Sequence, residues 1–357
     1  MIIIGRFLFF LFFLKPLLIF TQAFDRTKSL KYYSHKTIIT SQVRSEGNKA
    51  ILRGSESKKN REFVLSNYSG IQISVYPAWD FGFWPKQKPN SIDYFEYNID
   101  GLDELVNWGV ENKMYIIHHC LFFPNKYFPN WFWESNYNSN ELDQILKSYI
   151  EKVLYTNNNG KKIDALNVIN EIFDKNGNYR TSGNLKEDVK WMDIGFEDDN
   201  SGLSEEEKIN NKHPIFVGKV LQKSRSLSKA KLEIRDFNIA FGGKKADGLY
   251  QLIKHLKNSN IPIDAIGFQC HLNTNINYNY DNMYNNIKRF QEIGIDVYIT
   301  ELDVGMNLWG GYGRPRKKVS DVIKNDNDWN DYFEKQNKIY YNVIKTARLA
   351  GVELISD

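Results

Sequence analysis

Short apolar runs rich in β-branched residues alternate with longer segments of helical period along most of this chain of 357 residues. The pattern predicts strands over 71–76, 114–122, 163–169, 231–237, 263–268, 296–300 and 352–355, with a possible first strand at 37–43. Helices are predicted between them over 99–111, 142–155, 246–257 and 280–293. Strands and helices that take turns in this way predict parallel strands joined by right-handed crossovers.

Polar side chains directly follow almost every predicted strand. They are His118 and His119, Asn170 and Glu171, Asp236 and Asn238, Gln269 and His271, and Glu301 and Asp303. A doubly wound sheet shows the same alternation of strands and helices, but only in a closed barrel do all the strand ends converge on one rim. We therefore expect an α/β protein with a (β/α)8 TIM barrel, whose eighth strand is the run at 352–355.

The N-terminus has the pattern of a secretory signal peptide. Arg6 precedes an apolar run at 7–14 that resumes at 17–20 and ends in the small-residue pattern at 21–23. An uncleaved membrane anchor is the alternative, which Lys15 and Pro16 disfavour because they interrupt the run. We predict a signal peptide over 1–23, a polar lead-in with the possible first strand over 24–60, one barrel domain over 61–357, and an extracellular location.

The composition is that of a globular protein and narrows the choice of partners. The chain is 42% hydrophobic and 25% charged, which is enough apolar material for a large core. The formal net charge of +4 is spread along the chain without a dense basic stripe, so the sequence indicates no nucleic-acid partner. Two cysteines, Cys120 and Cys270, provide no disulfide framework. We expect a monomer without a stable membrane partner.

Two glutamates are candidates for acid–base chemistry at the barrel rim. Cleaving a glycosidic bond requires one carboxylic acid to protonate the leaving oxygen and a second carboxylate to attack the anomeric carbon or to activate water. Glu171 and Glu301 each follow a predicted strand and would rise from the floor of one cleft. A single glutamate at such a position is more often part of an ion pair at the rim. The presence of two glutamates at strand ends makes a catalytic role more plausible than one glutamate would.

Four segments resemble, in order and spacing, motifs of glycoside hydrolase family 10, the endo-β-1,4-xylanases. They lie at 167–171, 235–238, 266–272 and 299–304, and weaker similarity extends the match from about Phe63 to Asp357. The resemblance implies a (β/α)8 barrel and cleavage with retention of configuration. It also implies that Glu171 is the acid/base, that Glu301 is the nucleophile, that Asn170 bonds the sugar 2-hydroxyl and that His271 orients Glu301. No cofactor is implied.

Residue parity along the strands supports these roles. Gln269 and His271 are two residues apart, so both face the cleft as substrate-binding candidates, whereas Cys270 between them points away. The same rule directs His119 inward, also as a substrate-binding candidate, and Cys120 outward, so we interpret both cysteines as small core residues. A metal site built from His118, His119 and His271 is the alternative, but no metal-ligand spacing is evident. We expect the charge of Glu301 to raise the pKa of Glu171.

The chain departs from the family pattern in four places, one of which is the loop after the third strand, where the family's Trp-His and Gln are replaced around 123–127. The Glu-Asn pair that follows the family's second strand is missing, and Trp79, Phe83 or Trp84 are expected to stack on the sugar instead. The family's usual Trp-Asp before the acid/base segment is replaced by Leu166-Asn167. The family continues past the eighth strand with a Trp-Gly motif, a further Trp and a closing helix, so we expect a truncation after that strand.

The sequence therefore favours a retaining endo-glycosidase acting on β-1,4-xylan or a related plant polysaccharide. Two alternatives stay open. One is a catalytically impaired relative that binds carbohydrate, and the other is a β-1,4-glucanase or mannanase built on the same barrel, because a fold does not determine a substrate.

Overall fold

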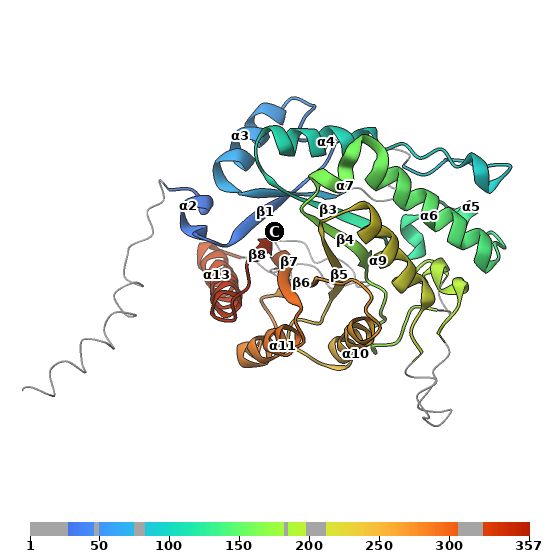
Figure 1. Ribbon diagram of the computed structural model, residues 1–357. Helices are drawn as coiled ribbons and strands as arrows, with labels where there is room; N and C mark the ends of the chain where they lie inside the picture. The colour runs from blue at the N-terminus through green and yellow to red at the C-terminus, as the bar shows by residue number, and fades with distance from the viewer. Residues whose placement is uncertain (1–27, 46–49, 75–82, 182–184, 198–211, 306–323) are drawn as a thin grey trace, which may run out of the picture.

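The described strands close, in chain order, into one parallel barrel. The computed structural model (Figure 1) describes residues 28–45, 50–74, 83–181, 185–197, 212–305 and 324–357. The strands are β1 (Ile38–Val43), β2 (Gly70–Ser74), β3 (Tyr115–Phe122), β4 (Ala165–Asn170), β5 (Lys231–Phe237), β6 (Ala265–Asn273), β7 (Asp296–Gly305) and β8 (Leu354–Ser356). The predicted (β/α)8 architecture is confirmed.

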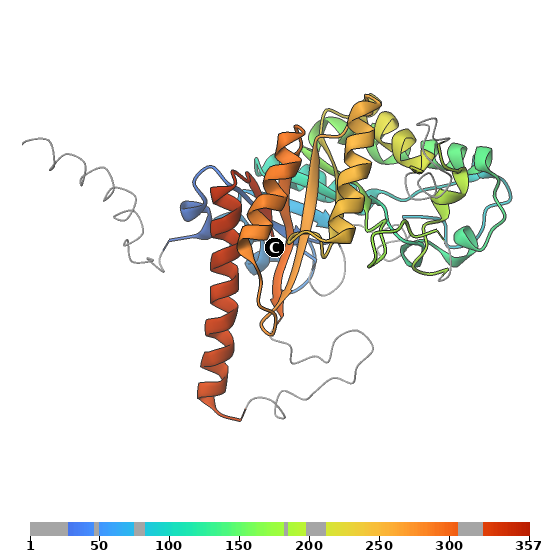
Figure 2. The same ribbon diagram turned by 90° about the horizontal axis from the view of Figure 1, so that it is seen from below.

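Helices surround the barrel and join its strands, and Figure 2 shows α10, α11 and α13 along one side. The described α-helices are α2 (Leu30–Ser34), α3 (Ser57–Asn67), α4 (Asp100–Glu111), α5 (Asn130–Trp133), α6 (Ser139–Tyr155), α7 (Asn159–Lys162), α9 (Ile215–Leu227), α10 (Lys244–Asn258), α11 (Tyr280–Glu292) and α13 (Asp326–Leu349). The four predicted helices are confirmed as α4, α6, α10 and α11. Helix α6 begins at a capping box, in which Asn138 and Glu141 each accept a hydrogen bond from the other's backbone N–H.

The first strand belongs to the barrel. β1 pairs with β2 on one side and with β8 on the other, so it closes the cylinder. The possible first strand is therefore confirmed, and the predicted domain boundary at residue 61 is wrong because the barrel already begins at Ile38. The predicted signal peptide lies outside the described residues. Within the described ranges, no helix has both the length and the apolar character needed to cross a bilayer.

The interior of the barrel changes from apolar to polar along the strands. At one end, inward-facing residues form a small buried cluster: Ile117, Ala165, Ala265, Tyr298 and Leu354. Two positions further along the same strands, on the same face, lie His119, Asn167, Gly267, Thr300 and Ser356. Most of the hydrophobic core forms a separate cluster between the strands and the helices. The barrel thus has an apolar floor and a buried polar layer above it.

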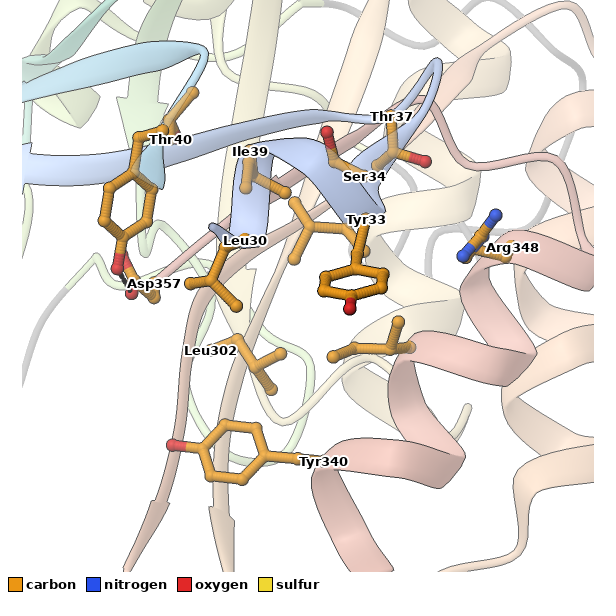
Figure 3. Close-up of a pocket in the computed structure, with 13 residues that line it drawn as sticks. Leu30, Tyr33, Ser34, Thr37, Ile39, Thr40, Leu302, Tyr340, Arg348 and Asp357 are labelled. Carbon is orange, nitrogen blue, oxygen red and sulfur yellow. Dashed lines mark hydrogen bonds between the residues drawn. The ribbon is translucent and has the colours of Figure 1, made fainter. Parts of the chain in front are cut away.

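A cavity of about 420 Å³ lies on the outer side of the barrel, next to α2, β1 and α13 (Figure 3). Its lining is mostly apolar and includes Leu30, Ile39, Leu302 and Ile344. Neither Glu171 nor Glu301 lines it. The cavity is therefore separate from the rim where the sequence places the chemistry.

Gly267 provides the space that a large buried side chain needs. A Cβ atom at this position would lie 2.5 Å from Cγ of Arg235 and 3.1 Å from Cγ2 of Thr300. We predict that Gly267→Ala lowers the free energy of unfolding by about 1–3 kcal/mol, because the arginine stem has to move. Urea denaturation measures this change. Gly305→Ala is the control, since its nearest neighbours lie 3.6 Å or more away. Equal effects of both variants would contradict this packing.

Candidate active site

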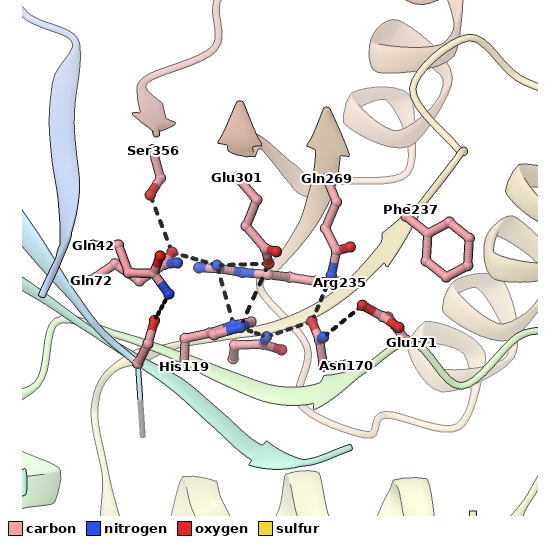
Figure 4. Close-up of polar contacts among 12 residues, drawn as sticks. Gln42, Gln72, His119, Asn170, Glu171, Arg235, Phe237, Gln269, Glu301 and Ser356 are labelled. Carbon is pink, nitrogen blue, oxygen red and sulfur yellow. Dashed lines mark hydrogen bonds and ion pairs between the residues drawn. The ribbon is translucent and has the colours of Figure 1, made fainter. Parts of the chain in front are cut away.

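The polar strand ends meet at one mouth of the barrel. Figure 4 shows the side chains of Glu171 and Glu301 approaching one polar network, with Asn170 next to Glu171 and His119 below Glu301. Gln269 joins the network by donating from Nε2 to Oδ1 of Asn170 at 3.0 Å. The convergence that the sequence predicted for these strand ends is confirmed.

A β-bulge positions the residue before Glu171. Asn167 and Asn170 are three residues apart, so regular alternation would send them to opposite faces of β4. The register between β4 and β5 shifts between Asn167 and Ile169, which inserts one extra residue into β4. Val168 and Ile169 both pack in the outer core. Asn167 and Asn170 consequently share the inner face, and Nδ2 of Asn167 donates to Oδ1 of Asn170 at 2.9 Å.

A second irregularity turns Glu301 inward. Thr300 faces the interior beside Gly267, so regular alternation would direct Glu301 outward. The register of β7 with β6 shifts at this point, and Glu301 has a left-handed φ of 51°. Glu171 likewise has a φ of 57°. Few residues other than glycine adopt this region, and such strain is often found at functional sites. Both glutamates are thus aimed at the barrel mouth by unusual backbone geometry.

Glu171 is mostly enclosed, and its pKa is raised to about 7. Burial is the largest cause, the negative charge of Asp236 comes next, and that of Glu301 follows. The predicted direction is therefore confirmed, although Glu301 is not the leading cause. Nδ2 of Asn170 donates to Oε1 of Glu171 at 3.4 Å. Glu171 can therefore hold a proton near neutral pH.

Asp236 is fully buried and is held by a lysine and by a backbone N–H group. Its Oδ1 lies 2.7 Å from Nζ of Lys245, and its Oδ2 accepts a hydrogen bond from the backbone N–H of Phe173 at 3.2 Å. Phe173 lies two residues after Glu171, so Asp236 also fixes the segment that carries Glu171. Nζ of Lys245 lies 3.3 Å from the ring centroid of Phe237.

Glu301 has the opposite electrostatic environment. Burial alone would raise its pKa, but His119, a hydrogen bond from His271 and the charge of Arg235 together lower it to about 2. Nε2 of His271 lies 3.3 Å from Oε2 of Glu301. Nη1 of Arg235 lies 3.9 Å from Oε1. Glu301 is therefore an anion over the whole ordinary pH range.

The two histidines beside Glu301 differ in charge. Burial tends to lower the pKa of His271, but hydrogen bonds to Asp303 and Glu301 raise it to about 10, so this ring is a cation. Burial lowers the pKa of His119 to about 4. Above that pH His119 is neutral, and it acts on Glu301 as an N–H dipole while His271 and Arg235 supply the positive charge.

The structure assigns different surroundings to the predicted substrate-binding residues. His119, Asn170 and Gln269 are almost fully buried beneath the glutamates, whereas His271 is exposed. Their contacts with a sugar stay predictions. Trp79 lies outside the described residues.

The prediction that Phe83 or Trp84 stacks on a sugar is wrong. Phe83 and Trp84 are each only 1% exposed. Trp84 packs against Phe132, Tyr149 and Trp191, with ring centroids 4.8, 5.3 and 6.2 Å away. An indole enclosed on all sides offers no free face to a ligand, so these rings belong to the core.

The alternative of a three-histidine metal site is not supported. His118 and His119 are neighbours along β3 and face opposite sides of the strand. Across the described ranges, no group of three or more His, Cys, Asp or Glu side chains is placed to hold a metal ion. Cys120 and Cys270 are buried and unpaired, as predicted.

Sequence reasoning missed three residues that shape the site. Arg235 was recognised only as part of a motif, Asp236 only as a polar residue at a strand end and part of that motif, and Asn167 only as a motif residue that departs from the family pattern. Strand parity was a usable signal, because Arg235 and Asp236 are adjacent on β5 and must face opposite sides. The site thus combines Glu171, which can be protonated, with Glu301, which stays ionised. These are the two groups that an acid-assisted displacement at an acetal carbon requires.

Comparison with known proteins agrees with this chemistry. The model of glycosyl hydrolase family 10 matches residues 84–351. Endo-1,4-beta-xylanase A of Thermoanaerobacterium saccharolyticum is 31% identical over 233 residues, which cover 62% of this chain and 18% of that protein. Endo-1,4-beta-xylanase B of Thermotoga neapolitana is 29% identical over 229 residues, which cover 64% of this chain and 58% of that protein. The matches thus span less than two thirds of either relative.

Solved structures share the fold. Xylanase 10B from Thermotoga petrophila RKU-1, in complex with xylobiose, superposes with a TM-score of 0.69 at 21% identity, covering 94% of this chain and 86% of that one. Native xylanase 10B from Thermotoga maritima gives a TM-score of 0.69 at 23% identity, covering 92% and 85%. With the family model matching most of its length, the chain belongs to glycosyl hydrolase family 10.

Proposed function

We propose that this protein cleaves the main chain of β-1,4-xylan, or of a related plant polysaccharide, as an endo-acting glycosidase that retains the anomeric configuration. The observation that carries the proposal is the opposite shift of two carboxyl pKa values at one barrel mouth, about 7 for Glu171 and about 2 for Glu301. Between these pH values Glu171 holds a proton and Glu301 is ionised. The first step of a double displacement requires this combination.

In the proposed mechanism, Glu171 protonates the leaving glycosidic oxygen while the carboxylate of Glu301 attacks the anomeric carbon. This carboxylate is held in place by His271 at Oε2, and its enclosed Oε1 faces Arg235 and His119. The product of the step is a glycosyl ester on Glu301. Glu171, now a carboxylate, then takes a proton from the water that attacks the same carbon and regenerates Glu301.

The substrate class is supported by the relatives. Those cited above carry the name endo-1,4-beta-xylanase, and one of the solved structures contains xylobiose. Glucan and mannan chains need the same pair of carboxyls, so a panel of xylan, β-glucan and mannan tests the choice of substrate. Binding to xylan without release of reducing ends would favour the carbohydrate-binding alternative and contradict the proposal.

Replacement of each glutamate separates their roles. Glu301→Gln is expected to lower the release of reducing ends from xylan roughly 10⁴-fold or more, because the nucleophile is lost. Glu171→Gln is expected to lose about 10²–10⁴-fold on xylan. It should retain its first step on an aryl xylobioside with a dinitrophenyl leaving group, which needs no protonation. The control is Glu151→Gln on the outer face of α6, where Glu151 pairs with Lys223. Equal losses of Glu171→Gln on both substrates would contradict the acid role.

The alkaline limit of activity should follow the charges around Glu171. Activity is lost as pH rises through about 7, because the acid loses its proton. Asp236→Asn removes a charge that raises this pKa, so the alkaline limb of kcat/KM should move down by about one pH unit. Lys126→Gln removes a charge that lowers it, so the limb should move up. Shifts of the same sign in both variants would be incompatible with Glu171 as the acid.

A further inference from the structure

A fully buried arginine lies beneath the proposed nucleophile. Arg235 has no exposed surface and is among the largest enclosed side chains of the protein. It lies on the inner face of β5, beside the space that Gly267 leaves open. Its Nε donates to Oε1 of Glu233 at 2.7 Å, Nη2 donates to the same oxygen, and Nη1 donates to Oε1 of Gln72 at 2.5 Å.

Burying this charge is costly, so its position needs a reason. Glu233, its partner, is also completely enclosed. Removing two ions from water commonly costs more than their mutual attraction returns, and a neutral pair at these positions would often be at least as stable. The pair is oriented: the guanidinium lies between Glu233 and Glu301, with Nη1 3.9 Å from the Oε1 atom of Glu301. The positive end of the pair therefore faces the nucleophile.

The same guanidinium helps to define the state of His119. Nδ1 of His119 faces two donors, Nδ2 of Asn167 at 2.8 Å and Nη1 of Arg235 at 3.5 Å. An atom that faces two N–H groups must accept, so the ring proton of neutral His119 lies on Nε2. Nε2 lies 3.6 Å from Oε1 of Glu301. His119 therefore presents an N–H group, and not a lone pair, to the nucleophile.

The orientation of the Asn167 amide is coupled to those of Asn170 and Gln269. Its Nδ2 also donates to Oδ1 of Asn170, and Nε2 of Gln269 donates to that same oxygen. A flipped Asn167 amide would place its oxygen against Oδ1 of Asn170, leaving two acceptors in contact. Asn167 thus acts as a donor to His119, where the family's usual Asp would be an acceptor and would favour a charged ring.

We propose that Arg235, held in the barrel by Glu233, is a positioning residue for the glycosidic reaction: it is the fixed cation that keeps Glu301 ionised while His119 stays neutral. Guanidinium suits the role because it does not lose its proton in proteins. The catalytic consequences of this proposal rest on the proposed function, whereas the charge states do not. When Glu301 becomes a neutral ester, Arg235 remains balanced by Glu233, so no buried charge is left unpaired during the cycle.

The charged and titratable groups around Glu301 lie on or directly after five strands. They are His119 on β3, Glu171 directly after β4, Glu233 and Arg235 on β5, His271 on β6 and Asp303 on β7. His271 is the other cation in this set, but it is exposed and shares its charge with Asp303. Arg235 is the cation that solvent does not screen.

The test removes the charges of Arg235 and Glu233 together, so that neither is left buried without its partner. The variant is Glu233→Gln with Arg235→Gln, which keeps hydrogen-bonding side chains at both positions. Glu301 should then titrate about one pH unit or more above its wild-type value of about 2. Carboxyl ¹³C NMR of glutamate-labelled protein measures this shift, with Glu301→Gln to assign the signal. The acid limb of kcat/KM should move up by the same amount.

A matched control lies at the other end of the same strands. Arg225 pairs with Asp264, whose Oδ2 also accepts the backbone N–H of Leu232 at 2.8 Å. Arg225→Gln with Asp264→Asn removes an arginine–carboxylate pair, with each side chain 32% exposed, at the opposite end of the strands from Glu301. It should lower stability without moving the titration of Glu301. If Arg235 only stabilises the fold, both double variants should lose stability and neither should move the titration of Glu301. That result would overturn the proposal.

A third substitution provides a rescue. Asn167→Asp, added to the double variant Glu233→Gln/Arg235→Gln, gives Nδ1 of His119 an acceptor and should make the ring a cation. The titration of Glu301 should then return toward the wild-type value, with the amides of Asn170 and Gln269 turned so that Asn170 donates to the new carboxylate. Failure of this rescue, with the fold intact by circular dichroism, would contradict the assigned charge states.

The NMR titration separates this inference from the proposed function. Wild-type protein that releases no reducing ends from any polysaccharide tested, but whose Glu301 titration responds to the double variant, would refute the proposed function alone. Active wild-type protein whose Glu301 titration and acid limb are unchanged in the double variant would refute the role of Arg235 alone.

Discussion

The active site depends on one electrostatic constraint, which is that two enclosed carboxyl groups at one barrel mouth must keep opposite protonation states. Burial by itself raises the pKa of both Glu171 and Glu301. The difference comes from what lies beneath each of them. Glu171 has the buried Asp236 as its near neighbour, whereas Glu301 lies among N–H groups and cations that include Arg235 and His271. The barrel thus separates negative charge from positive charge across a short distance.

The fold meets this constraint through local departures from regular geometry. In a regular barrel strand only alternate side chains face the interior, yet the consecutive residues Thr300 and Glu301 both do so. The register shift in β7 and the left-handed backbone of Glu301 solve this conflict, and a bulge in β4 does the same for Asn170. Strained conformations of this kind persist only where the surroundings determine them strongly. Buried polar side chains provide that support, because Asn167 bonds to His119, Gln269 bonds to Asn170 and Arg235 bonds to Gln72 across different strands.

Much of the fold and the identity of the two glutamates could be predicted from the sequence, because apolar periodicity and polar strand ends are local signals. The helix α13 was missed although Ile339, Val343 and Ala347 are buried along one face, since apolar and aromatic residues also occur on its exposed face and obscure the helical period. Trp84 was misplaced because an aromatic residue in a polar loop gives no local sign of what encloses it. Arg235 could not be assigned, since its partners Gln72 and His119 come from other strands.

The central claim is that Glu301, held as an anion, forms a covalent bond to the sugar. A 2-deoxy-2-fluoro xylobioside with a dinitrophenyl leaving group tests this claim. The fluorine slows hydrolysis of the glycosyl ester on Glu301, so the ester accumulates. Peptide mass spectrometry should then find one sugar adduct on the peptide that contains Glu301, and none in Glu301→Gln. An active wild-type protein that forms no adduct, or that carries it on another residue, would contradict the account.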